Sequence, residues 1–542
     1  MLETGPAAAE VVSEWQSRVA AMLAALGWPR GEIVAARHQR AMSLAFSAPA
    51  DRLLTATEIN EWAWIGAAGL PAPASPGFPA AEDFDSALHT LRAAAAAEAR
   101  PRQLQLQDQA RAHGLPCLVD DEALSLGAGD GSRSWPLDSL PDSPDWSLLH
   151  DVPTALVTGS NGKTTTVRLV AAMLAAAGRR VGFNCTDGVF VDGDRVQRGD
   201  YSGPGGAREV LRQLRVQAAV LECARGGLLR RGLAVQHAHA AIVTNVSADH
   251  FGEYGVESLE DLADAKLVVA RAIGADGVLV LNADDPVLRQ RAVRLDCPLA
   301  WFSVAGDVPP RDGKGMDCVL RDGRLWLRVG ERLTDLGEVA AMPLSLGGAA
   351  RYNLANLAGA SLVAAALGVP PMKIAQVLAH FGARRQDNPG RLERWRIGEA
   401  WVVLDYAHNP EGLQGLLEVA EGLRGSTGRL GLLLGQAGNR EDADIARLAR
   451  VAASARPARV VLKDIAGYLR GREDGEVAAL LAAELEAAGV APRDIAVELS
   501  EADAAQALVE WSGPGDVVVL PVHNLEARDQ LAAWLDQQAA DR

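Results

Sequence analysis

Short apolar runs and longer helical stripes alternate along the chain from about residue 151 onward. Each apolar run is followed by a helical pattern, which is typical of a parallel α/β domain. Two apolar stretches around Asp322-Gly323 interrupt this rhythm and predict a β-hairpin over 317–330. A helix is expected at about 352–367. The first α/β region has predicted strands at 154–157, 218–221, 240–244 and 277–281.

A second α/β rhythm begins near residue 391. Its regular spacing predicts a separate open-sheet, Rossmann-like domain of about 150 residues. The strands of this domain are expected near 400–404, 430–434, 458–462 and 516–520.

The first 148 residues have a different pattern. An amphipathic helix over 8–26 ends at Gly27 and Pro29. Thr55 and Glu58 fit a capping box that opens a helix over 58–64. An alanine-rich helix is expected over roughly 84–114, and the turn-rich stretch 127–147 is interpreted as a domain boundary. These features predict a separate small α+β domain over 1–148, followed by a central domain over 149–388 and a C-terminal domain over 389–542.

The segment 154–166 carries the most specific chemistry of the chain. A strand runs into the loop Gly159-Ser160-Asn161-Gly162, and a helix starts near Lys163. Glycines let backbone N–H groups approach phosphate oxygens, and a helix N-terminus adds positive potential. Lys163 would reach the β- and γ-phosphates, and the Thr164 hydroxyl would bind Mg²⁺. Val157 stands where the usual motif has its first glycine. The segment therefore predicts a phosphate loop, with nucleotide contacts from Gly159, Asn161, Gly162, Lys163, Thr164 and Thr165.

Polar residues follow several other predicted strands. Glu222 ends the strand 218–221, where an acidic residue is a natural Mg²⁺ ligand, and Asp249-His250 follows the strand 240–244. Lys266 lies in a helical stretch, and its spacing alone favours a surface lysine. Asn353 and Asn356 are one helical turn apart, which suggests contacts to a base or ribose, with helix capping as the alternative.

Composition restricts the class of protein. The chain has 542 residues, 49% apolar content and a formal net charge of −16 without a basic stripe, which argues against nucleic-acid binding. Neither a signal peptide nor an apolar run of membrane-spanning length is visible, so a cytoplasmic location is expected. Five scattered cysteines without a CxxC pair indicate neither a zinc site nor a disulfide framework. They are expected to be small buried hydrophobes.

The order of these motifs resembles the Mur ligase superfamily over roughly 150–542, and within it most of all the Mur-ligase-like half of the cyanophycin synthetases. The shared order is the phosphate loop, the strand-end Glu, Asp-His, a lysine, paired asparagines and Gly-Arg, followed by two motifs after strands of the last domain. Those two motifs are Asp405-Tyr406-Ala407-His408-Asn409-Pro410 and Gly435-Gln436-Ala437-Gly438-Asn439-Arg440. Further points of likeness are Thr186-Asp187-Gly188-Val189, Gly199-Asp200-Tyr201-Ser202-Gly203-Pro204, Glu222-Cys223-Ala224-Arg225-Gly226-Gly227-Leu228-Leu229-Arg230 and Asn282-Ala283-Asp284-Asp285-Pro286. An ATP-grasp glycine loop, which the cyanophycin synthetases also carry, is not visible in this sequence.

The resemblance implies roles for individual residues. Lys163, Glu222, His250 and Lys266 would form the catalytic centre, with Thr164, Glu222, His250 and Lys266 around two Mg²⁺ ions and Lys266 as the lysine that Mur ligases carbamylate. Asn353, Arg391 and Asp405 would contact the adenine, phosphate and ribose of ATP. The predicted substrate residues are Thr186, Ser202, Arg225, His408, Asn409 and Arg440.

The implied activity is ATP-dependent ligation of a carboxylate to an amine through an acyl phosphate, with release of ADP. An acidic amino-acid or peptide acceptor and a cationic amine are expected, since Arg225 and Arg230 could pair with a carboxylate, and Asp187, Asp200 and Glu441 are available for a cation. An amidotransferase subunit that uses ammonia and a non-catalytic subunit of a two-protein ligase are the alternatives. The region 1–148 is expected to present substrate or hold a homo-oligomer, and a separate ATP-grasp ligase is a candidate partner.

Overall fold

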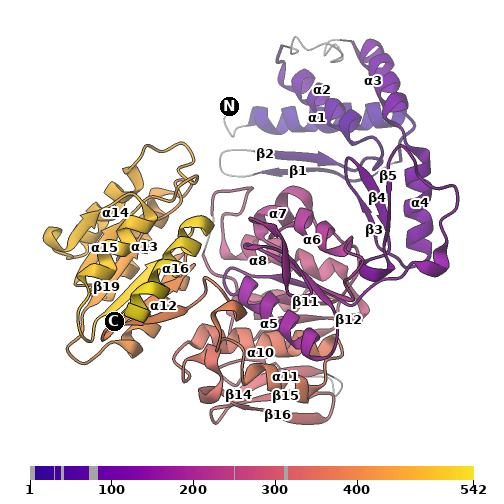
Figure 1. Ribbon diagram of the computed structural model, residues 1–542. Coiled ribbons are helices and arrows are strands. Elements are labelled where there is room, and N and C mark those ends of the chain that lie inside the picture. The colour runs from indigo at the N-terminus through magenta and orange to yellow at the C-terminus, as the bar shows by residue number, and fades with distance from the viewer. Residues whose placement is uncertain are drawn as a thin grey trace. The chain divides into compact units, whose positions relative to one another are not determined.

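A computed structural model describes residues 6–29, 31–37, 42–71, 83–248, 251–309 and 315–541 (Figure 1). The chain divides into two compact units. One comprises residues 1–151 with 251–261, and the other comprises residues 152–250 with 262–542. Within the described residues, no helix is long and apolar enough to cross a membrane.

The first unit is an α+β assembly, as the sequence predicts. Its helices pack around Trp15, Ile59, Trp62 and Leu91. Two small antiparallel sheets accompany them, β1-β2 and β3-β4-β5. The elements are α1 (Pro6–Ala25), β1 (Ile33–Arg37), β2 (Met42–Phe46), α2 (Leu53–Ala68), α3 (Phe84–Glu98), α4 (Pro101–Ala112), β3 (Cys117–Val119), β4 (Ala123–Leu126) and β5 (Arg133–Pro136).

Two expectations for this region are wrong in detail. Helix α2 begins at Leu53, and the Thr55 hydroxyl donates a hydrogen bond to Glu98 at 2.7 Å, so Thr55 opens no capping box. The alanine-rich helix is broken at Arg100, because Pro101 disfavours helical backbone at the residue before it. The stretch 127–147, interpreted from the sequence as a domain boundary, contains β5 and the 3₁₀ turn η1 (Gly129–Gly131), and a second 3₁₀ turn, η2 (Trp146–Leu148), begins at its end.

The second unit holds an 11-stranded sheet among its described residues, in the order β16-β15-β14-β13-β12-β11-β6-β10-β7-β8-β9. The strands from β14 to β7 in that order are parallel, and antiparallel hairpins extend both ends of the sheet. The strands are β6 (Thr154–Thr158), β7 (Val181–Cys185), β8 (Gly188–Val191), β9 (Asp194–Arg198), β10 (Ala218–Glu222), β11 (Ala238–Val243), β12 (Ile273–Asn282), β13 (Leu299–Ser303), β14 (Met316–Arg321), β15 (Arg324–Val329) and β16 (Arg332–Glu338).

The predicted strands and the Asp322-Gly323 hairpin of this region are confirmed, whereas β7, β8, β9, β13 and β16 were not predicted. Helices α5 and α10 are buried over most of their length and share one core with the sheet. The helices are α5 (Lys163–Ala176), α6 (Pro204–Leu211), α7 (Arg225–Arg231), α8 (Leu259–Leu267), α9 (Pro286–Ala292), α10 (Arg351–Ala366) and α11 (Pro371–Leu378).

The C-terminal part of the second unit has a six-stranded sheet in its described residues, in the order β17-β18-β22-β19-β20-β21. Only β17 is antiparallel to its neighbour, and one apolar cluster covers each face. This is the expected Rossmann-like sheet. Its elements are β17 (Glu393–Ile397), β18 (Ala400–Asp405), α12 (Pro410–Leu423), β19 (Leu430–Leu434), α13 (Asp442–Ser454), β20 (Arg459–Leu462), α14 (Glu476–Ala487), β21 (Ile495–Val497), α15 (Glu501–Trp511), β22 (Val517–Pro521) and α16 (Leu525–Asp541).

Candidate active site of the second unit

The loop between β6 and α5 requires glycine at two positions. Gly162 has a φ of 85°, and a Cβ there would lie 2.1 Å from Oδ1 of Asn356 on α10. Gly159 has a φ of 146°, and its Cβ would lie 1.8 Å from Oγ1 of Thr244. Any side chain would therefore force the loop away from both neighbours, since these backbone conformations also disfavour L-residues.

The loop forms hydrogen bonds with the segment that follows β11. The backbone N–H of Asn161 donates to Oδ1 of Asn245 at 2.9 Å, and the Thr244 hydroxyl donates to the Asn161 carbonyl at 2.6 Å. Ser160 donates its hydroxyl to the carbonyl of Ser247 at 3.1 Å. Sequence reasoning missed these supports, although Thr244-Asn245-Val246-Ser247 directly precedes the Asp-His pair that it singled out.

Lys163 folds back over the loop that precedes it. Its Nζ donates to the carbonyl oxygens of Gly159 at 3.1 Å and Ser160 at 3.0 Å. The ammonium group is thus held at the N-terminus of α5, where backbone N–H groups also point outward. This arrangement suits an anion such as a nucleotide phosphate.

Glu222 is buried at the end of β10 and faces two hydroxyl groups. The Thr164 hydroxyl donates to its Oε2 at 2.8 Å, and the Thr186 hydroxyl donates to its Oε1 at 3.4 Å. Burial raises the pKa of Glu222, and the charge of Lys163 opposes that rise. A buried carboxylate beside a hydroxyl oxygen is the donor set that Mg²⁺ favours, and a cation would offset the cost of burying this charge. Thr164 and Glu222 therefore fit a magnesium site.

Of the other residues predicted for the metal site, only Lys266 is among the described residues. Lys266 lies near the end of α8 with 3% of its surface exposed, so the expectation of a surface lysine is wrong. Asp249 and His250 lie outside the described residues.

The paired asparagines of α10 are both buried. Nδ2 of Asn356 donates to Oδ1 of Asn353 at 3.1 Å, and Nδ2 of Asn353 donates to the carbonyl of Leu344 at 3.1 Å. Neither residue caps the helix, because the N-cap is Ala350. Asn356 also reaches the phosphate loop, since it is the nearest neighbour of Gly162.

Arg391 and Asp405 meet where the C-terminal sheet begins. The Arg391 guanidinium lies 4.3 Å from the ring centroid of Tyr406, and Asp405 accepts the backbone N–H groups of Leu392 and Ala407 at 2.7 and 2.8 Å. Burial raises the pKa of Asp405, and Arg391 opposes that rise. Burial would lower the pKa of Arg391, but the carboxylates of Asp187 and Asp405 outweigh it and raise that pKa.

The comparisons with known proteins agree with this geometry. Residues 157–364 match the Mur ligase middle domain, and residues 390–521 match the Mur ligase, glutamate ligase domain. Over 450 residues the chain is 30% identical to the UDP-N-acetylmuramoyl-L-alanyl-D-glutamate–2,6-diaminopimelate ligase of Chlorobaculum tepidum, with 76% of this chain and 85% of that protein covered. The chain belongs to the Mur ligase superfamily. The relative from Chlorobaculum tepidum is a ligase by name.

Further relatives of this Mur ligase include the cyanophycin synthetase of Crocosphaera subtropica, at 37% identity over 347 residues. That alignment covers 63% of this chain and 38% of the relative, so the chain spans little more than a third of the length of that protein. Among solved structures, E. coli FolC in complex with DHPP and ADP matches with a TM-score of 0.52 and 20% identity, covering 71% of this chain and 89% of that one. This likeness supports the fold.

One expectation about the substrate side of the Mur ligase site is wrong. Asp187 was expected to be available for a cationic substrate, but it is buried and already paired. Its carboxylate accepts from Arg168 at 3.0 Å and from Arg528 of α16 at 2.8 Å. Burial would raise its pKa, but Arg391, Arg528 and Arg168 together lower the pKa to about 2.

The remaining predicted substrate residues lie in turns and helix starts. Ser202 donates its hydroxyl to Asp200 at 2.6 Å, and Arg225 is buried at the start of α7. Asn409 caps α12, and its Nδ2 donates to Oδ1 of Asn161 in the phosphate loop at 3.0 Å. His408 precedes Asn409, and Arg440 is buried ahead of α13. The structure thus brings Asn409 to the phosphate loop.

The motif Asn282-Ala283-Asp284-Asp285-Pro286 has a structural role. Asp285 caps α9 and also accepts the backbone N–H of Val246 at 2.7 Å, while Asp284 accepts the Ser303 hydroxyl at 2.6 Å. This motif therefore fixes the segment after β11 that supports the phosphate loop.

A cavity of about 570 Å³ lies along the second half of α5. The Phe183 and Phe190 rings, stacked 4.7 Å apart, form part of its wall, and its central charges pair with one another, as Arg168, Asp187 and Arg528 do. These pairings leave the three central groups little capacity for a charged ligand.

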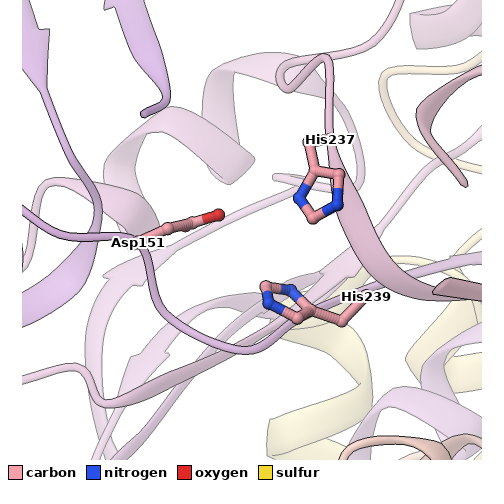
Figure 2. A group of neighbouring side chains, drawn as sticks. All are labelled: Asp151, His237 and His239. Carbon is pink, nitrogen blue, oxygen red and sulfur yellow. The ribbon is translucent and has the colours of Figure 1, made fainter. Parts of the chain in front are cut away.

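The cysteines are free in the structure, and Cys185, Cys223 and Cys318 are buried as expected, while Cys117 and Cys297 are half-buried. Figure 2 shows a different group of candidate metal ligands, Asp151, His237 and His239, whose ligand atoms lie within 4.8 Å of one another. Nδ1 of His239 already accepts the backbone N–H of Thr154 at 3.2 Å, so this nitrogen is not available to an ion.

Proposed function

We propose that this Mur ligase joins a carboxylate of an acidic amino acid or peptide to the amine of an amino acid, with release of ADP and phosphate. The observation that carries the proposal is the buried contact between Thr164 and Glu222 beside Lys163 and the phosphate loop. A carboxylate is a poor acyl donor, and transfer of the γ-phosphoryl group of ATP would convert it to an acyl phosphate that an amine attacks.

The residues of the site have distinct roles in this proposal. Lys163 and the N-terminus of α5 would hold the transferring phosphoryl group and stabilise its charge. Mg²⁺ bound by Thr164 and Glu222, with Lys266 as a carbamylated ligand and His250 beside them, would neutralise the β- and γ-phosphates. Asn353, Arg391 and Asp405 would position the nucleotide, with Thr165 and the loop glycines at its phosphates.

The substrates would lie between the central sheet and the C-terminal sheet. Thr186, Ser202 and Arg225 would contact the carboxylate substrate, and His408, Asn409 and Arg440 would contact the incoming amine or close over it. The contact between Asn409 and Asn161 supports this proposal, because it joins a motif of the C-terminal sheet to the phosphate loop. Water would be excluded from the acyl phosphate by that closure.

A cationic amino acid is proposed as the amine on the basis of the resemblance to the cyanophycin synthetases. The sequence offered Asp187, Asp200 and Glu441 as carboxylates for a cationic substrate. Of these, Asp187 forms ion pairs with Arg168 and Arg528. A separate ATP-grasp ligase remains the proposed partner for the same reason of resemblance.

The test is nucleotide turnover with a matrix of acidic acceptors against arginine, lysine, ornithine, neutral amino acids and ammonia. We expect ADP and phosphate only when acid and amine are both present. Lys163→Ala should reduce turnover by several orders of magnitude, because a charge placed on the transferring group is lost. Lys373→Ala, at an exposed position of α11, is the matched control. Formation of AMP would refute the mechanism, and a preference for ammonia would favour the amidotransferase alternative.

A further inference from the structure

Three ionisable side chains share one buried place in the C-terminal sheet. Lys463 follows β20, Glu501 begins α15 and His523 follows β22, and the exposed fractions of their side chains are 0%, 4% and 6%. The Lys463 ammonium forms a short ion pair with Glu501. Gly435 makes room for the lysine, because a Cβ there would lie 2.9 Å from the Cδ and Cε atoms of Lys463.

The hydrogen bonds of this cluster fix the proton on the imidazole. Nζ of Lys463 lies 2.9 Å from Nδ1 of His523. A charged ammonium can only donate, so Nδ1 must be the acceptor and the neutral ring carries its proton on Nε2. That Nε2 lies 3.0 Å from the carbonyl oxygen of Ala407, to which it donates.

Glu501 is fully occupied in this arrangement. Besides Lys463, its carboxylate accepts the backbone N–H groups of His523 at 2.7 Å and Asn524 at 3.0 Å. Burial would raise the pKa of Glu501, but Lys463 and His523 outweigh it and lower that pKa. Burial, followed by the charge of Lys463, lowers the pKa of His523 to about 4. The cluster therefore holds an ion pair and a neutral imidazole.

The chain of contacts ends at the phosphate loop. Ala407 lies in the turn that follows β18, and Asn409 two residues later donates to Asn161. Gln436 supports the same turn from β19, since its Nε2 donates to the His408 carbonyl at 3.1 Å. Lys463 thus contacts His523, and His523 contacts the turn through the carbonyl oxygen of Ala407.

We propose that Lys463 and His523 are positioning residues, which hold the imidazole as a donor to Ala407 and so place the turn with His408 and Asn409 against the phosphate loop. Stability alone does not explain them, because a buried ion pair is often replaced by apolar side chains without loss. The proposal deepens the proposed function, since it concerns the turn assigned there to the amine side of the site.

Other charged or titratable groups face the cluster. Asp464 acts on Lys463, and His408 acts on His523. The Tyr406 ring lies edge-on to His523, with 5.3 Å between the ring centroids. Loss of Lys463 would leave the imidazole beside a Glu501 carboxylate that has lost its ammonium partner. Its pKa should then rise into the neutral range.

The first experiment reads the imidazole directly in the full chain by ¹⁵N spectroscopy of labelled histidine between about pH 5 and pH 8. In the parent protein, His523 should keep the Nε2–H tautomer throughout, with the signal assigned by its loss in His523→Gln. Lys463→Met should make this histidine titrate within that range, whereas Lys373→Met should not. An unchanged tautomer in Lys463→Met would overturn the proposal.

The second experiment tests the turn at the far end of the chain of contacts. A glutamine amide has one acceptor and one donor at the spacing of the two ring nitrogens, so His523→Gln should preserve the bridge and His523→Leu should break it. The N–H of Ala407 donates to Asp405, and the N–H of Gly412 donates to Oδ1 of Asn409. We expect faster hydrogen exchange at these two amides in His523→Leu, and parent-like exchange in His523→Gln. Equal exchange in both variants would overturn the proposal. This comparison does not use Lys463→Met, so it decides the question even if that variant does not fold.

Ligation separates this proposal from the proposed function. If the chain ligates as proposed, His523→Leu should lower kcat by ~10- to 100-fold, because a displaced catalytic turn is costly, and His523→Gln should restore most of it. If no ligation is found with any substrate pair while the spectroscopic and exchange results hold, the proposed function fails and the positioning role stands.

Discussion

The buried ion pair between Asp187 and Arg528 is expected to stabilise the second unit. Asp187 has 2% and Arg528 4% of the side chain exposed, and Nη1 of Arg528 lies 2.8 Å from Oδ1 of Asp187. Arg528 also packs against Gly390, where a Cβ would lie 2.4 Å from its Nη1. The perturbation is Arg528→Met, which keeps an unbranched apolar stem and removes the guanidinium group with its charge.

The magnitude follows from the pKa of Asp187. The surrounding arginines hold it at about 2, against an ordinary value of 3.8. At about 1.4 kcal/mol for each pKa unit, the ionised carboxylate contributes roughly 2–3 kcal/mol net of burial. Removing one partner of a buried pair costs ~3–5 kcal/mol when the other charge is left alone. Because Arg168 still contacts Asp187 in the variant, we expect a loss of about 2–3 kcal/mol in the free energy of unfolding.

The pH dependence has a definite sign. The folded-state pKa of Asp187 is lowered, so its contribution is present above about pH 4 and is lost as the pH falls toward 2. In Arg528→Met the pKa of Asp187 should rise, and less of this contribution is then present at neutral pH. The stability difference between parent and variant should therefore shrink as the pH is lowered through this range.

The assay is urea-induced unfolding with hydrogen exchange at β7 and α16, which assigns the transition to the second unit. Arg198→Met is the matched control. Arg198 pairs with Asp529 of α16 at 3.1 Å, but these side chains are 50% and 44% exposed, so its loss should cost less than ~1 kcal/mol. Equal destabilisation by Arg528→Met and Arg198→Met would refute the reasoning.

Two further predictions concern the phosphate loop and the metal site. Gly162→Ala should weaken ATP binding by at least ~10-fold, measured by calorimetry, because its Cβ would meet Asn356, and Gly178→Ala, at a positive-φ position with open space around it, is the control that should bind ATP normally. Lys266→Ala should be inactive in the ligation assay and regain part of its activity with formate or acetate, which would replace a carbamate; full activity without any additive would rule out a carbamylated Lys266.

The sequence determined many of the local elements and predicted the phosphate loop. Apolar runs with turn residues between them located β6, β10, β11 and β12 and most of the C-terminal sheet, because strand period and loop chemistry are local properties. Glu222 was placed beside the loop for a related reason, since the carboxyl ends of parallel strands meet at one edge. The strands β7, β8 and β9 were missed because their short, mixed segments lack a clear period.

Only the tertiary structure decided which charged groups are free for chemistry. Asp187 and Arg528 are 341 residues apart in the chain, and their pairing removed a carboxylate that the sequence had left available for a substrate. The sequence around Lys266 and Lys463 does not indicate that these side chains are buried, yet both are buried in the structure. Their neighbours come from strands and helices distant in sequence, and burial and charge pairing depend on those neighbours, so no local pattern can encode them.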